Sequence, residues 1–81
     1  MEQPVRRFLS KFCKGTDMRA GEIDVSFIPL ANLQVIFQEP AEEPMYWSYD
    51  IKEKHARALQ PFVAEPIDLD AYEYFLESEA V

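Results

Sequence analysis

The chain is short and acidic. It has 81 residues, a formal net charge of −7 and an apolar content of 48%. This length suits one domain with one hydrophobic core, and the apolar content is too high for a disordered acidic tail. The negative charge disfavours binding to nucleic acid or to an anionic membrane, and no run of about 18 apolar residues predicts a transmembrane helix.

The cysteine content and the distribution of charge add two expectations. Cys13 has no second cysteine for a disulfide, and with the single histidine it cannot complete a zinc site. This is typical of a reducing cytosol, and no signal peptide precedes Arg6, so we expect a cytoplasmic protein. Residues 1–20 carry a charge of +3 and residues 21–81 a charge of −10. Such a negative field favours basic partners. Solubility alone is the other explanation of the same charge.

The first segment, Val5–Cys13, fits either a strand or a helix. Its apolar residues follow the spacing of an amphipathic helix, but residues 14–17, Lys-Gly-Thr-Asp, are typical of a turn. After this turn, residues 23, 25 and 27 alternate on one face as in a strand. We predict a hairpin of Val5–Cys13 with Met18–Val25, and a leading helix is the alternative.

Two helices are predicted in the middle of the chain. The first begins at Pro29, places apolar residues on one side through residue 37, and ends near residue 39 because Pro40 disfavours helical geometry before it. The second follows Asp50, which is expected to form a capping box with Glu53. Pro61 should kink or end this helix.

The last segment, Ile67–Ser78, is ambiguous between a strand and a helix. Asp70 and Glu73 could cap a helix, whereas Tyr72, Tyr74 and Leu76 alternate as in a strand. We predict a strand, with Glu73, Phe75 and Glu77 on one face and Asp70, Tyr72, Tyr74 and Leu76 on the other. The result is a small α+β single domain of residues 1–81 with the order ββααβ.

No set of residues predicts catalysis. His55, the only histidine, lies on the apolar side of the second helix, where a packed structural role is expected, and Cys13 suits a small core residue. The two glycines form no phosphate-binding motif, and Asp68-Leu69-Asp70 lacks the remainder of a calcium loop. We predict a non-catalytic protein without cofactor or metal. The enzymatic alternative is carboxylate chemistry at Glu42, Glu43, Asp68 or Asp70.

The segment from Pro40 to Asp50 is the strongest candidate for a protein-binding site. It combines Tyr and Trp, which dominate interface hot spots, with acids that steer a basic partner. The sequence slightly favours a core role for Trp47, because a single Trp in a small chain often anchors the core. Acids and tyrosines recur near the C-terminus. There the acids fit a partner-binding surface and, equally well, an edge strand whose charge prevents aggregation. The candidate partner-binding residues are Glu42, Glu43, Tyr46, Trp47, Tyr49, Asp50, Asp68, Asp70, Tyr72 and Tyr74.

Four segments of the chain carry a family resemblance. They are residues 21–29, Leu33-x-x-Ile36-Phe37, residues 43–46 and residues 68–77, of which Pro-Met-Tyr and Tyr-x-Tyr-Phe-Leu-Glu are the most specific. Together, over residues 8–78, they resemble a family of small uncharacterised bacterial proteins. The resemblance implies the hairpin and the final strand but no activity, and Trp47 and Pro61 depart from its pattern. In size and acidity the chain is similar in type to immunity proteins encoded beside bacterial toxins.

These observations lead to two functional hypotheses. The first is an immunity or inhibitor protein that neutralises a basic bacterial toxin, for example a nuclease, through an acidic and aromatic surface. The alternative is a regulatory or adaptor domain that binds a housekeeping protein through the same surface. The oligomeric state and the identity of the partner stay open at this level. An adjacent toxin gene would favour the first hypothesis, and an operon of metabolic genes the second.

Overall fold

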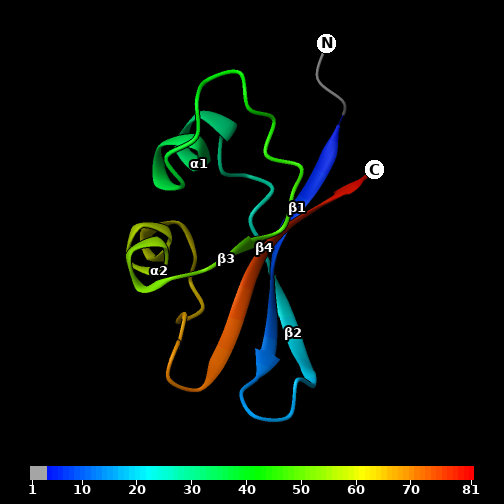
Figure 1. Cartoon of the computed structure of the whole chain (residues 1–81), viewed down its shortest axis with the longest axis vertical. Coiled ribbons are helices and arrows are strands. Elements are labelled where there is room, and N and C mark those ends of the chain that lie inside the picture. Colours follow the sequence, from blue (N-terminus) through cyan, green and yellow to red (C-terminus); the bar gives the residue numbers. More distant parts are fainter. Residues whose placement is uncertain (1–3) are drawn as a thin grey trace.

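A computed structural model describes residues 4–81, which form a four-stranded antiparallel sheet with two short helices on one face (Figure 1). The elements in chain order are β1 (Val5–Cys13), β2 (Arg19–Asp24), α1 (Leu30–Ile36), β3 (Tyr49–Asp50), α2 (Glu53–Leu59), the 3₁₀ turn η1 (Gln60–Phe62) and β4 (Tyr72–Ala80). The strand order is β2-β1-β4-β3. The predicted α+β class and approximate ββααβ order are confirmed. Among residues 4–81, no helix is long and apolar enough to cross a membrane.

The predicted N-terminal hairpin is confirmed, and the alternative leading helix is wrong. The chain reverses at Gly15 and Asp17, both with positive φ, and the backbone N–H of Cys13 donates to the carbonyl of Met18 at 2.8 Å. Turn chemistry therefore outweighs the helical spacing of the apolar residues. β1 pairs with β2 on one side and with β4 on the other, so it lies in the interior of the sheet.

The final strand is also confirmed, but its boundaries differ from the prediction. β4 begins at Tyr72 rather than at Ile67, because the preceding residues form a turn. In this turn the carboxylate of Asp68 accepts the backbone N–H groups of Asp70 at 3.0 Å and of Ala71 at 3.2 Å. An aspartate that bonds the backbone in this way competes with a strand ladder, so pairing starts only after it.

Both helices are confirmed, with a correction at the start of α2. The carboxylate of Asp50 does not cap the helix and instead pairs with Lys52 Nζ at 2.9 Å. The backbone N–H of Lys52 donates to Nδ1 of His55 at 3.0 Å, so His55 takes the part that Glu or Gln plays in a capping box. As predicted, regular turns end at Pro61, which lies in η1. The two-residue strand β3 was not predicted.

The core lies between the sheet and the two helices. Leu9 of β1 and Leu76 of β4 face each other in register and are fully buried with Leu33 and Leu59 from the helices. Within β4 the predicted faces are confirmed, because Tyr74 and Leu76 point into this core while Phe75 points away. Asp70, predicted on the same face as Tyr74, instead lies exposed in the turn before the strand. No helix covers the other side of the sheet, as Figure 1 shows for the described residues. We call this side the open face.

Candidate protein-binding site

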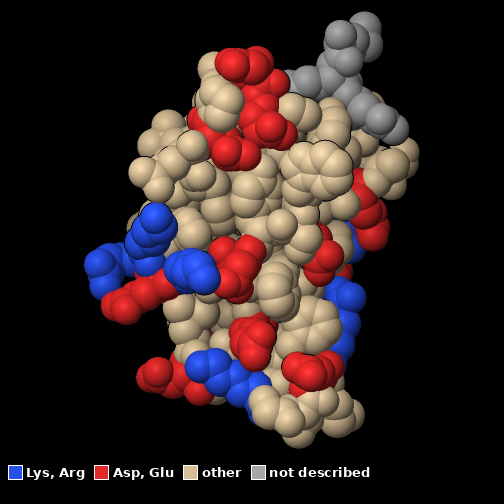
Figure 2. Space-filling view, viewed as in Figure 1, with Lys and Arg blue, Asp and Glu red and all other residues tan. Residues whose placement is uncertain are grey.

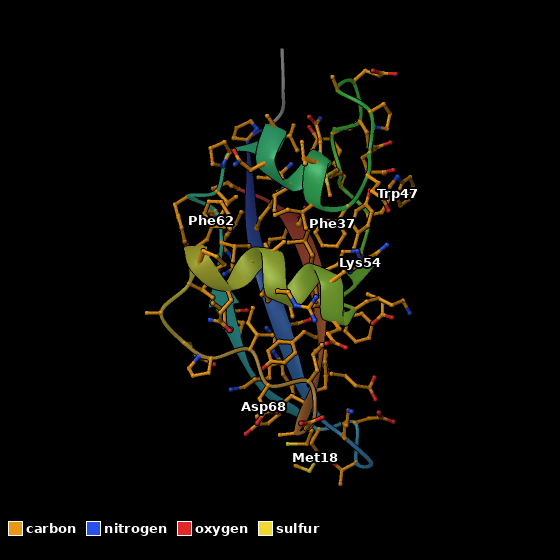
Figure 3. All side chains as sticks on the ribbon, turned by 90° about the vertical axis from the view of Figure 1, so that its left-hand side faces the viewer. Met18, Phe37, Trp47, Lys54, Phe62 and Asp68 are labelled. Atoms are coloured by element: carbon orange, nitrogen blue, oxygen red, sulfur yellow. The ribbon has the colours of Figure 1, made fainter. Side chains whose placement is uncertain are left out.

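The segment between α1 and β3, residues 37–48, displays two aromatic side chains, and we call it the aromatic loop. Trp47 is 73% exposed and Tyr46 is 39% exposed, whereas Met45 beside them is fully buried. Figure 3 shows Trp47 at the outer edge of the molecule. The core role that the sequence slightly favoured for Trp47 is therefore wrong, because Met45 fills the core at this position.

Side chains of the sheet hold the backbone beside these aromatic residues. Arg7 of β1 donates from Nη2 to the carbonyl of Pro44 at 2.8 Å, and Ser78 of β4 donates from Oγ to the carbonyl of Met45 at 3.1 Å. Met45 has a φ of 56°, a left-handed conformation that costs energy for a residue with a Cβ. These hydrogen bonds and the burial of the Met45 side chain offset that cost.

A glutamine of α1 holds the preceding part of the aromatic loop. Gln34 is 7% exposed, and its Nε2 donates to the carbonyls of Ala41 at 3.0 Å and Glu43 at 2.8 Å. The carboxylate of Glu43 in turn accepts the backbone N–H of Met45 at 3.0 Å. The aromatic loop is therefore tied to α1, β1 and β4, so it presents Tyr46 and Trp47 on a fixed backbone.

The other predicted residues of this segment have mixed environments. Glu42 and Asp50 are exposed, whereas Tyr49 is half-buried, with its ring centroid 5.2 Å from that of Phe37. The Tyr49 hydroxyl donates to the carboxylate of Glu39 at 2.7 Å. Burial and this carboxylate raise the pKa of the Tyr49 hydroxyl above its ordinary value. Through these contacts with Phe37 and Glu39, Tyr49 supports the aromatic loop. Figure 2 shows acidic side chains gathered at the top of the view, the end of the molecule where the aromatic loop lies.

The second predicted array, near the C-terminus, contributes two exposed acids and two tyrosines that pack inward. Asp68 and Asp70 are exposed and line an open groove of about 660 Å³ against α2. Tyr72 is half-buried, with Lys11 Nζ lying 4.4 Å from its ring centroid. Tyr74 is 1% exposed, and its hydroxyl accepts the backbone N–H of Asp68 at 3.1 Å. The assignment of Tyr74 to a partner contact is corrected, because a side chain in the core cannot reach a partner.

The two predicted arrays do not form one continuous acidic surface. Figure 3 shows Lys54 of α2 between Trp47 and Asp68, which lie toward opposite ends of the molecule. Besides Lys54, the exposed side of α2 carries Arg57, and Lys52 precedes the helix. Lys52 and Arg57 form ion pairs with Asp50 and Glu53, so a partner that covers both arrays would have to cross a strip of mixed charge. Of the two, the aromatic loop is the candidate site, because it alone presents large exposed aromatic side chains.

A comparison with family models assigns most of the chain to one family. Residues 6–77 match the model of a domain of unknown function, DUF7683, which covers most of the chain. The chain belongs to the DUF7683 family. No curated protein matches it.

Two side chains of this DUF7683 domain could carry chemistry, and one of them, His55, has structural partners. His55 stacks on Phe37 with 4.3 Å between ring centroids, and its Nδ1 accepts the N–H of Lys52. Burial, together with the charge of Lys54, lowers the pKa of His55. Cys13 is a half-buried free thiol. Among residues 4–81, no three His, Cys, Asp or Glu side chains come together in an arrangement that could hold a metal ion.

Three residues that position the aromatic loop of the DUF7683 domain were not predicted from the sequence. Arg7, Gln34 and Ser78 hold its carbonyls, yet they lie in three different elements. Arg7 and Gln34 are polar residues with less than a tenth of their surface exposed. A polar residue within an otherwise apolar stretch is a sequence signal for a buried hydrogen-bonding role. The sequence does not show which segment of the backbone such a residue contacts.

Proposed function

We propose that this DUF7683 domain is a non-catalytic inhibitor that binds a basic protein through its aromatic loop. The observation that carries the proposal is Trp47, which is 73% exposed on a backbone fixed by buried side chains. Trp and Tyr are enriched in interface hot spots, and a rigid support lowers the entropy lost on binding. An anchored loop that holds an indole in water is therefore well suited to insert it into a pocket of a partner.

The charge of the chain supports a basic partner. The net charge is −7, and Glu42 lies exposed in the same loop as Trp47. Complementary charge accelerates encounter and disfavours acidic partners. In its specific form, the proposal is an immunity protein that neutralises a bacterial toxin such as a nuclease. A nuclease binds phosphate through basic side chains, so an acidic cover with an aromatic anchor would block that surface.

Binding to the product of the neighbouring gene tests this proposal. We expect a Kd below about 1 µM, or roughly −8 kcal/mol, measured by titration calorimetry with purified proteins. Replacing Trp47 with Ser should weaken binding by about 30-fold or more, as expected for a hot-spot residue worth about 2 kcal/mol. Co-expression should also restore growth to cells that produce the toxin.

Val35 provides a matched control for this experiment. It is 78% exposed on α1, so Val35→Ser also removes an exposed apolar side chain, but outside the aromatic loop. This variant should bind with the wild-type Kd. Equal affinities of the wild-type protein and Trp47→Ser would refute the proposed site. A partner that binds through Trp47 but keeps its own activity would indicate an adaptor rather than an inhibitor.

A further inference from the structure

The open face of the sheet contains one phenylalanine that the protein covers with its own arginines. Phe8 of β1 is only 6% exposed, although no helix packs on this side. The guanidinium carbon of Arg6 lies 4.1 Å from the centroid of the Phe8 ring, and that of Arg19 lies 5.9 Å from it. Glu22 binds both arginines, with 2.8 Å between Arg6 Nη1 and its carboxylate. This arrangement combines two cation–π contacts with ion pairs to one carboxylate.

The neighbouring part of the open face has the same aromatic and acidic components without the cations. The rings of Phe12 and Phe75 meet edge to face with 5.9 Å between their centroids, and both side chains are half-buried. Glu73 lies opposite Phe12 in the register of β1 and β4, and Glu77 accepts a hydrogen bond from Ser10. Among residues 4–81, no Lys or Arg pairs with Glu73 or Glu77 or lies over either ring.

The charge that the three long strands place on the open face is also uncompensated. The three long strands place five acids on it, Glu22, Asp24, Glu73, Glu77 and Glu79, against two bases, Arg6 and Arg19, which leaves a formal charge of −3. Both bases are already committed to Glu22, and Arg6 also contacts Glu79 at 3.2 Å. The acids beside Phe12 and Phe75 therefore attract cations from outside the chain.

We infer that Phe12, Phe75, Glu73 and Glu77 bind arginine side chains of a basic polypeptide. The partner's guanidinium groups would stack on the two rings and pair with the two carboxylates, as Arg6, Arg19 and Glu22 do over Phe8. A planar guanidinium both stacks on a ring and donates to a carboxylate, so arginine fits this surface better than lysine. The inference rests on the proposed protein-binding function, but it concerns a different surface from the aromatic loop.

A titration with a defined peptide tests the inference without the natural partner. The probe is an octapeptide of alternating arginine and serine, added to the ¹⁵N-labelled full chain at low salt. We expect the largest amide shifts at the four named residues and at Ser10 between them. The double variant Glu73→Gln with Glu77→Gln should weaken peptide binding by roughly fivefold or more, because it removes two carboxylates that pair with the cations.

The matched control has the same net charge as this double variant. Glu53→Gln with Glu65→Gln also changes the formal charge from −7 to −5, but at exposed sites outside both the open face and the aromatic loop. This control should bind the peptide within about twofold of the wild-type protein. The single variant Glu73→Gln, at an exposed position, should weaken binding even if the double variant unfolds. An equal loss in the control, or shifts centred elsewhere, would overturn the inference.

Two further comparisons separate this surface from the aromatic loop. A lysine–serine peptide should bind roughly threefold more weakly than the arginine–serine peptide, whereas equal affinities would contradict guanidinium stacking. Trp47→Ser should leave peptide binding unchanged. If the peptide does not bind but the natural partner still depends on Trp47, the open-face inference fails and the proposed function stands.

Discussion

Met45 and Trp47 are two positions apart, yet one is fully buried and the other is 73% exposed. The difference comes from the backbone, because the left-handed φ of Met45 turns its side chain into the core. Local composition does not distinguish these two residues, since both are large and apolar. Their opposite environments predict opposite consequences of substitution.

Truncating Met45 should destabilise the protein, and truncating Trp47 should not. Met45→Ala removes a buried side chain and should lower the free energy of unfolding by about 2–5 kcal/mol. Trp47→Ser should change it by less than about 0.5 kcal/mol, because the indole makes few buried contacts. Urea denaturation followed by circular dichroism measures both values. A large loss of stability in Trp47→Ser would mean that the indole packs against the fold.

His55 predicts a dependence of stability on pH. Burial and the nearby Lys54 and Lys52 lower its pKa, while Asp50 acts in the opposite direction. In the unfolded chain the pKa of histidine is about 6.5. Below that pH the unfolded state takes up a proton that the folded state does not, so the free energy of unfolding falls as the pH decreases. Above that pH the imidazole is neutral in both states and contributes no slope.

Replacing His55 with Gln should remove this slope. Gln at the same position can still accept the N–H of Lys52 but does not titrate, although it loses the stacking on Phe37. We expect a lower free energy of unfolding at all pH values and a weaker dependence between about pH 7.5 and 5.5. Urea denaturation at three pH values in this range provides the measurement. An unchanged slope would assign the pH dependence to the carboxylates.

At the scale of elements, the aromatic loop depends on contacts with distant parts of the chain. Arg7 of β1 is 37 residues from Pro44, and Ser78 of β4 is 33 residues from Met45. Only the completed sheet brings these side chains to the loop. The order of the loop is therefore coupled to the fold. Replacing Gln34 on α1 is the most direct way to reduce the order of the loop.

Gln34→Leu should both destabilise the protein and loosen the aromatic loop. Leucine has a similar size but leaves the carbonyls of Ala41 and Glu43 without their donor, which should cost about 1–3 kcal/mol. Trp47 is the only tryptophan, so its time-resolved fluorescence anisotropy reports loop motion directly. We expect greater fast motion of the indole in this variant. The exposed change Asn32→Leu on α1 is the control and should leave the anisotropy unchanged.

The sequence predicted the elements with strong local signals and missed those set by long-range contacts. The turn at residues 14–17 and the alternation of Tyr72, Tyr74 and Leu76 were enough for the hairpin and the final strand. β3 has two residues and exists only through its pairing with Leu76 and Phe75, so it has no periodicity of its own. For the same reason the sequence located the aromatic loop but not the orientation of its side chains.

At the scale of the whole molecule, folding redistributes the charge that is uneven along the chain. Two of the five basic residues among residues 4–20 pair with acids far away in sequence, Arg6 with Glu79 and Lys11 with Glu65. These cations are therefore largely neutralised within the fold, and the excess of acids stays at the surface (Figure 2). Exposed ion pairs of this kind add little stability. The net negative field is therefore available to act on partners.

The last prediction concerns the kinetics of partner binding. If the partner is basic, raising NaCl from about 50 to 500 mM should lower the association rate constant at least about tenfold, because salt screens the long-range attraction. The dissociation rate constant should change much less, since short-range contacts of Trp47 set it. Trp47→Ser should show the converse, with faster dissociation and little change in association. Stopped-flow fluorescence or surface plasmon resonance separates the two rate constants. An association rate independent of salt would mean that the acidity of this domain serves solubility and that its partner is not basic.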